Sequence, residues 1–225
     1  MLKRWSQLAP LTGIVFVALL VVVTTTTGNT PSDKASGAKV ISYYQHHHTA
    51  QNVGAYLLTV AAVFGLYFYS SLRRYLQRSA EISNLASTMF GGAVLFAAAM
   101  CIGAGTTGAL ANHPTRLSTS AAQALNYMSN NLFGYMFAAG LIAVMLSAGL
   151  AIVRSRLLPA WLGWTALVIG VLPFTYVLLW PAFMATGVWT LIVSVLVYQR
   201  AKEPMTIEIP GARVAAPSSR EMVEH

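Results

Sequence analysis

The chain consists of long, nearly uninterrupted apolar stretches separated by short polar segments. A helix needs about 20 mainly apolar residues to cross the hydrocarbon core of a bilayer, because each residue rises only about 1.5 Å. The stretches do not alternate between polar and apolar residues and are too long for barrel strands, so helices are predicted. The pattern predicts six membrane spans, at about 8–27, 53–72, 85–110, 132–153, 159–179 and 182–199.

The last two spans come from one apolar block, residues 158–198, which is too long for a single helix. Trp180-Pro181 divides this block. The residue before a proline is disfavoured in the α region, and proline lacks the N–H that a helix interior needs. We therefore predict a tight helical hairpin that turns at this pair.

Charge is scarce, and this changes the class of protein that the chain can be. Only 9% of its 225 residues are charged, against about 25% in an ordinary soluble domain. So few charges cannot cover a water-soluble surface, which excludes a soluble enzyme or DNA-binding domain. The 56% apolar content excludes a disordered chain as well.

The 14 Lys and Arg residues give the predicted orientation, because cytoplasmic loops of membrane proteins are enriched in them. With the N-terminus inside, the outer loops carry only Lys34, Lys39 and Arg116. The N-terminus and C-terminus are both predicted inside, and the net charge of +8 needs no nucleic-acid partner. The basic residues beside the inner span ends are Lys3, Arg4, Arg73, Arg74, Arg78, Arg154, Arg156, Arg200 and Lys202.

The predicted architecture is an all-α, six-helix transmembrane bundle over residues 1–201, with a small helical cap on the outer side and a flexible cytoplasmic tail over 202–225. In the first outer loop, Pro31-Ser32-Asp33 resembles a helix start. Val40, Ile41 and Tyr44 then share one helical face. In the second outer loop, Ser118 or Ser120 could begin a helix that continues into the fourth span.

The first span could instead be a cleaved signal peptide, since a basic start precedes a short apolar run. The segment TTTTGNT that follows lacks a small-x-small cleavage site, which favours an uncleaved anchor.

The candidate site residues lie in the two outer loops. The run His46-His47-His48 could bind a ligand, but consecutive helical side chains point about 100° apart, so the three cannot all face one metal ion. His113 would have to complete a tetrahedral site. The competing interpretations are a solvated surface for the histidines and interfacial anchoring for the tyrosines. The predicted ligand-binding residues are Tyr43, Tyr44, His46, His47, His48, Asn126, Tyr127, Asn130 and Asn131.

Several kinds of chemistry have no signature in the sequence. No nucleophile elbow, Walker motif, paired carboxylates or CxxC is present, so no catalytic residue, metal ligand or cofactor is predicted. No ionisable residue lies at the centre of a predicted span, and ion-coupled carriers usually place one there. Asp33 is the only acidic residue in the outer loops. Trp161 and Trp164 fit an inner interfacial belt, and Trp180 fits an outer one.

Three segments, LAPLTGIVFVALLVVV, AKVISYYQHH and LPAWLGWTALVIGVLP, resemble a widespread group of uncharacterised bacterial multi-pass membrane proteins. The most specific element is LPAWLGW at 158–164. The resemblance covers about residues 8–200 and supports the six-helix topology, but the group has no established activity that could be transferred.

We therefore expect a multi-pass protein of the bacterial cytoplasmic membrane. The leading hypothesis is a non-enzymatic protein that binds a small or lipidic ligand under the outer cap, or serves as an accessory subunit. The alternatives are a passive or facilitated permeation pathway and a metal-dependent enzyme that uses the outer histidines. The expected partners are the lipid bilayer, a lipid or small-molecule ligand, and another membrane protein or a second copy of the chain.

Overall fold

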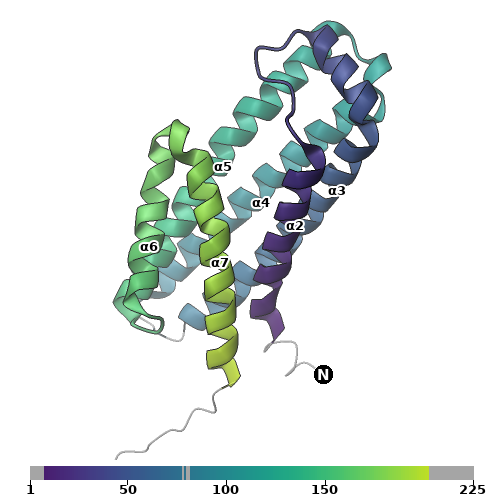
Figure 1. The fold of residues 1–225 in the computed structure, drawn as a ribbon. Coiled ribbons are helices and arrows are strands. Elements are labelled where there is room, and N and C mark those ends of the chain that lie inside the picture. Colours follow the sequence, from purple (N-terminus) through teal and green to yellow (C-terminus); the bar gives the residue numbers. More distant parts are fainter. Residues whose placement is uncertain (1–7, 78, 80–81, 203–225) are drawn as a thin grey trace, which may run out of the picture.

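The structure is a computed structural model that describes residues 8–77, 79 and 82–202. This part of the chain is all-helical and contains no strand. The start of α2 and the end of α7 lie at the same end of the bundle (Figure 1). The opposite end, where residues 28–36 connect α2 to α3, is called the linker end below. The elements are η1 (Ala9–Leu11), α2 (Thr12–Thr27), α3 (Gly37–Leu76), α4 (Ser83–Asn112), η3 (Pro114–Arg116), α5 (Thr119–Ser155), α6 (Ala160–Val171), η4 (Leu172–Phe174), η5 (Tyr176–Leu178) and α7 (Leu179–Lys202).

Five helical segments are long and apolar enough to cross a membrane. The apolar segment Ala160–Phe174 is shorter. Its 12 residues of α6 and 3 of η4 rise about 24 Å, which is less than the ~30 Å hydrocarbon core of a bilayer. The segment predicted as a full-length fifth span is therefore a short helix here. Of the tail predicted over 202–225, Lys202 ends α7 and the rest lies outside the described residues. The predicted inner residues Lys3, Arg4 and Arg78 also lie outside them.

The second predicted span is the lower part of a 40-residue helix, α3, which begins at Gly37. The helix start predicted at Pro31-Ser32-Asp33 is wrong, because Ser36 caps α3 by accepting a hydrogen bond from the Lys39 N–H at 3.4 Å. The helical backbone of α3 is interrupted at His47, whose φ of −117° and ψ of 15° mark a kink. The loop expected to carry a separate surface helix is thus the first part of α3.

The predicted apolar face at the start of α3 is present. Val40 and Tyr44 are buried, and Ile41 packs partly buried against the same cluster. This second apolar cluster also contains Leu110 from α4 and Ala122 from α5. Three long helices therefore pack together at the linker end, beyond the reach of the α6–α7 hairpin (Figure 1).

The fourth predicted span likewise continues upward, as α5, to Thr119. Ser118 is the N-cap, and its hydroxyl accepts a hydrogen bond from the Ala121 N–H at 3.2 Å. Of the two candidate serines, Ser118 begins the helix that runs into the span.

The turn of the last hairpin does not lie at Trp180-Pro181. The chain leaves α6 through η4 at Pro173, passes an extended Thr175 and enters α7 at Leu179. Pro181 sits in the first turn of α7, where the missing N–H has no intrahelical partner to lose. The prediction placed the turn at the wrong proline because a proline interrupts a helix interior but is compatible with a first turn.

The α4–α5 pair packs closely through small residues. A Cβ added at Gly92 in α4 would lie 2.8 Å from both the Ala143 Cβ and the Val144 backbone nitrogen. Helices in a membrane gain little from burying apolar surface, so close backbone approach at small residues contributes much of their association. The neighbouring Gly91 faces outward, with no atom within 4 Å of an added Cβ.

These two adjacent glycines give a matched test of the α4–α5 contact. Gly92→Ala should lower the free energy of unfolding by about 1–3 kcal/mol, because the backbone of α5 cannot move away without loosening the pair. Gly91→Ala should change it by less than about 1 kcal/mol. Reversible unfolding in mixed micelles measures both, and equal effects of the two substitutions would contradict this packing.

Candidate ligand pocket

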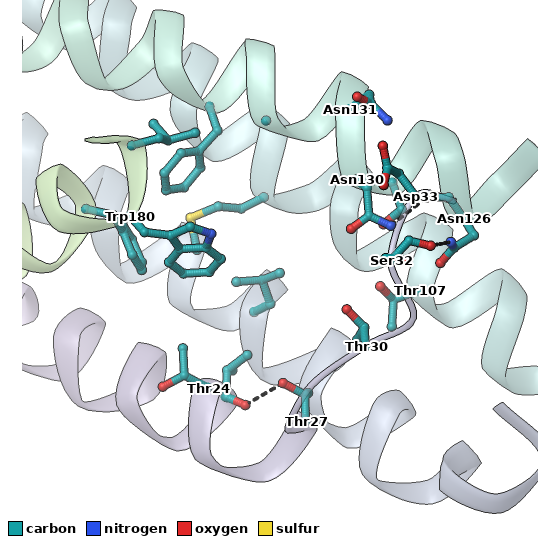
Figure 2. A pocket seen from close by; sticks show the side chains of 18 of the residues that line it. Thr24, Thr27, Thr30, Ser32, Asp33, Thr107, Asn126, Asn130, Asn131 and Trp180 are labelled. Carbon is teal, nitrogen blue, oxygen red and sulfur yellow. Dashed lines mark hydrogen bonds between the residues drawn. The ribbon is translucent and has the colours of Figure 1, made fainter. Parts of the chain in front are cut away.

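A cavity of about 540 Å³ lies near the linker end of the bundle. The end of α2, the linker, α5 and the start of α7 surround it, and α3 and α4 form its inner wall. Figure 2 shows polar side chains gathered at one end, around Asp33 and the asparagines, and Trp180 at the other. The polar lining residues are Thr24, Thr27, Thr30, Ser32, Asp33, Tyr44, Thr107, Asn126, Ser129, Asn130, Asn131 and Tyr176. The other lining residues are Leu20, Val23, Leu58, Met100, Gly134, Phe137, Leu179, Trp180 and Phe183.

Two asparagines of α5 hold the linker over the cavity. The Asn126 side chain is 1% exposed, and its Nδ2 donates to the Ser32 carbonyl at 2.8 Å. One turn further along α5, the Asn130 Nδ2 donates to the Pro31 carbonyl at 3.4 Å and to the Asn126 carbonyl at 2.9 Å. The polar end of the cavity is therefore built from an irregular segment whose backbone is fixed by side chains of a regular helix.

The end of α2 is fixed to α3 in a similar way. Gln51 is 1% exposed, and its Nε2 donates to the Thr27 carbonyl at 2.8 Å and to the Tyr43 hydroxyl oxygen at 2.9 Å. The Tyr43 hydroxyl donates to the same Thr27 carbonyl at 3.2 Å. The last helical carbonyls have no intrahelical partner, and these bonds supply one at the point where Gly28, at φ 59°, ends α2.

Aromatic rings form the apolar end. The Phe137 ring of α5 meets the Phe183 ring of α7 edge-on, with centroids 5.1 Å apart. The Trp180 ring lies 5.9 Å from the Phe183 ring, also edge-on. Trp180 is 65% exposed even though it lines the cavity. The predicted interfacial tryptophan thus stands at the edge of the pocket.

Four of the nine predicted ligand-binding residues, Tyr44, Asn126, Asn130 and Asn131, line the cavity, and the other five do not. Tyr43 instead connects α2 and α3, as described above. Tyr127 is exposed and is not part of the lining.

The three histidines are exposed along α3 and turn toward their own helix. Ring Nδ1 atoms lie 2.7 Å from the Ser42 carbonyl for His46, 2.9 Å from the Tyr43 carbonyl for His47 and 3.2 Å from the Gln45 carbonyl for His48. The His47 ring also stacks on the Tyr43 ring, with centroids 4.4 Å apart. Within the described ranges, no three His, Cys, Asp or Glu side chains are grouped so that they could hold a metal ion.

The sequence interpretation missed the apolar half of the pocket and its carboxylate. Phe137 and Phe183 belong to different predicted spans and Trp180 to the predicted turn, and nothing in a single sequence shows that these segments meet. Asp33 could have been noticed as a candidate because it is the only acidic residue of the predicted outer loops. No contact between its loop and another part of the chain was predicted, however. The contact between the linker and α5 places Asp33 in the pocket lining.

No family model, curated protein or solved structure matches the chain. The five long apolar helices indicate a multi-pass membrane protein.

Asn126 gives a test of how the linker is held. Asn126→Asp replaces the donating amide by a carboxylate that faces the Ser32 carbonyl, so two acceptors oppose each other in a buried site. We expect a loss of about 1–3 kcal/mol in stability and faster amide exchange over residues 28–36, measured by hydrogen–deuterium exchange.

Asn131→Asp is the matched control. The half-buried Asn131 donates through Nδ2, at 3.0 Å, only to the Tyr127 carbonyl of its own helix. Linker exchange should change little in this variant. Equal exchange in both variants would show that Asn126 does not anchor the linker.

Proposed function

We propose that this is a non-enzymatic integral membrane protein that binds a small amphiphilic ligand in the cavity beneath its linker. The linker end faces outward and acts as the cap of the bundle, with both termini on the cytoplasmic side. The membrane is the cytoplasmic membrane of a bacterium.

The observation that carries the proposal is the two-ended chemistry of the cavity. Its volume of about 540 Å³ lies in the range of small-molecule sites, which is about 300–1,000 Å³. Hydroxyl, amide and carboxylate groups cluster at one end, and aromatic and aliphatic side chains at the other. A molecule with one polar and one apolar part would satisfy both ends, whereas a uniformly polar or apolar molecule would leave one end unmatched.

The membrane placement follows from chain direction and charge. α5 ends and α7 ends at the same end of the bundle, so α6 has to return the chain to the other side despite its short length (Figure 1). This supports six crossings, one of them short. Arg73, Arg74, Arg154 and Arg200 lie near the helix ends opposite the linker, which supports an inner position for that end.

The alternatives have less support. The metal-dependent enzyme needs a ligand set that the exposed histidines do not form within the described residues. A permeation pathway and an accessory role stay predictions, and solute flux through proteoliposomes tests the first of them.

Filling the cavity tests the proposed function. Ser129 lines the polar end and is half-buried, so Ser129→Trp should occupy the space that a ligand needs. Met128, its neighbour on α5, is 46% exposed and does not line the cavity, so Met128→Trp is the matched control. Native mass spectrometry of protein extracted in mild detergent should show a bound small molecule on the wild type and on Met128→Trp.

Ser129→Trp should lose the bound mass nearly completely, with thermal stability near that of the control. The proposal fails if the wild type carries no added mass after incubation with a lipid extract of its own membrane. It fails equally if Ser129→Trp retains the same mass as the wild type.

A further inference from the structure

We infer that the ligand is a long-chain primary amine, whose ammonium group binds at the Asp33 end of the cavity and whose hydrocarbon chain lies in a groove between α2 and α7. This inference rests on the proposed function and specifies the chemistry of the ligand. Three observations carry it: the direction of the hydrogen bonds in the pocket, its charge, and the groove beside it.

The first observation is that three asparagine amides and two threonine hydroxyls of the lining donate to backbone carbonyls. Asn126, Asn130 and Asn131 each donate through Nδ2 to a carbonyl, which fixes the amide orientation because a carbonyl oxygen can only accept. The Thr24 and Thr27 hydroxyls donate to the Val21 and Val23 carbonyls, both at 2.9 Å.

The amide oxygens of these asparagines are left as acceptors, beside a second Nδ2–H on Asn126 and on Asn131. No hydrogen bond within the described part of the chain reaches the Oδ1 atoms of the three asparagines. A ligand that supplies N–H donors fits such a surface. A phosphate or carboxylate would place its own oxygens beside these amide oxygens and the Asp33 carboxylate.

The second observation is the charge. Asp33 is the only Asp or Glu among the described residues, and it lines the cavity at half-buried exposure. Within the same ranges, no Lys or Arg is part of the lining, and the adjacent Lys34 is exposed. The pocket therefore presents one carboxylate without a resident cation. An alkyl ammonium carries three donors and, with a lysine-like pKa near 10.4, is charged at neutral pH.

The third observation is a second, apolar groove of about 280 Å³ between α2 and α7. It shares Leu20, Thr24 and Phe183 with the cavity, so the two spaces are adjacent. Gly187 leaves it open, since an added Cβ there would meet only the Val17 Cγ1, at 3.8 Å. Both helices are candidate membrane spans. A hydrocarbon chain leaving the apolar end of the cavity would enter this groove.

The head and the chain have different roles in binding. A chain that moves from bilayer hydrocarbon into an apolar groove gains little, because lipid tails are as apolar as the groove. Charge-assisted hydrogen bonds to the head group supply the discrimination. The head-group comparison is therefore the decisive experiment, and the groove is tested second.

Four amphiphiles with the same hexadecyl chain separate the contributions: hexadecylamine, hexadecyltrimethylammonium, hexadecanol and palmitate. Native mass spectrometry of full-length protein in nonionic micelles should show hexadecylamine bound about tenfold more tightly than each of the other three. The quaternary amine has the charge but no N–H donor, and palmitate has the opposite charge. Equal binding of the primary and quaternary amines, or preference for palmitate, would overturn the inference.

Asp33→Asn should weaken hexadecylamine binding about tenfold, to the level of hexadecanol, and leave hexadecanol binding unchanged. Asp33→Glu restores the charge and should recover much of the preference, with thermal unfolding reporting that both variants fold. Unchanged amine preference in Asp33→Asn would overturn the assignment of the head-group site. An excess of ethanolamine should not displace hexadecylamine, and displacement would indicate a water-soluble amine as the ligand instead.

Gly187→Leu tests the groove, with Gly105→Leu as the control, because an added Cβ at Gly105 meets no atom within 4 Å. Gly187→Leu should lower hexadecylamine binding about threefold, and Gly105→Leu should not change it. Unchanged binding in Gly187→Leu would overturn the path assigned to the chain. If the wild type bound none of the four amphiphiles, the proposed function itself would be contradicted. The failure of the inference and the failure of the proposed function are therefore distinguishable.

Discussion

Four phenylalanines lie ring against ring in a row that connects α2 and α7 to α4 and α5. Phe16 of α2 meets Phe96 of α4 with centroids 6.4 Å apart, and Phe96 meets Phe137 of α5 at 4.4 Å. Phe137 then contacts Phe183 of α7. The chain of rings reaches α4 and α5 at a point of close approach, since a Cβ added at Gly140 would lie 2.7 Å from the Phe96 nitrogen. Each such ring pair contributes about 0.5–1.5 kcal/mol beyond its buried area.

These aromatic contacts are important because, in a bilayer, the burial of apolar surface no longer drives helices to associate. Apolar side chains facing lipid are already in an apolar solvent, so shape and contact geometry decide which helices meet. The rings connect α2 and α7 to α4–α5, and two of them, Phe137 and Phe183, line the apolar end of the cavity. The pocket is therefore a consequence of the packing that positions α7 and not a separate addition to the bundle.

At the polar end of the cavity, too, residues that hold the fold together also line the pocket. A linker without regular structure has backbone carbonyls that need donors, and the side chains of Asn126, Asn130 and Gln51 supply them there and at the end of α2. Amides that donate to backbone in this way turn their oxygens elsewhere. The bonds that order the linker thus also fix how the Asn126 and Asn130 amides are oriented in the pocket.

Local signals in the sequence were sufficient wherever a helix depends on its own residues. Ser118 begins α5 as a capping serine, and Val40 and Tyr44 are buried at the spacing of one helical face. The same signals failed where one residue is compatible with two local structures. Pro181 could either interrupt a helix or lie in the first turn of one, and it lies in the first turn of α7. Polar residues such as His46 and Gln51 do not end α3, because a helix can continue with polar side chains where it is no longer surrounded by apolar residues.

The pocket could be only partly predicted, because Asp33 and Trp180 are about 150 residues apart and only the packing of α2, α5 and α7 brings them to one cavity.

The unequal lengths of the helices explain where the cavity lies. α5 has 37 residues and is about 55 Å long, whereas α6 and η4 rise about 24 Å. The α6–α7 hairpin therefore stops well below the linker end, and its tip, with Tyr176 and Trp180, stands where the long helices continue without it (Figure 1). A hairpin as long as α4–α5 would fill this position with two further helices. The short α6 is thus the feature that leaves space for the cavity beside α5, at the level where polar and apolar side chains of the bundle meet.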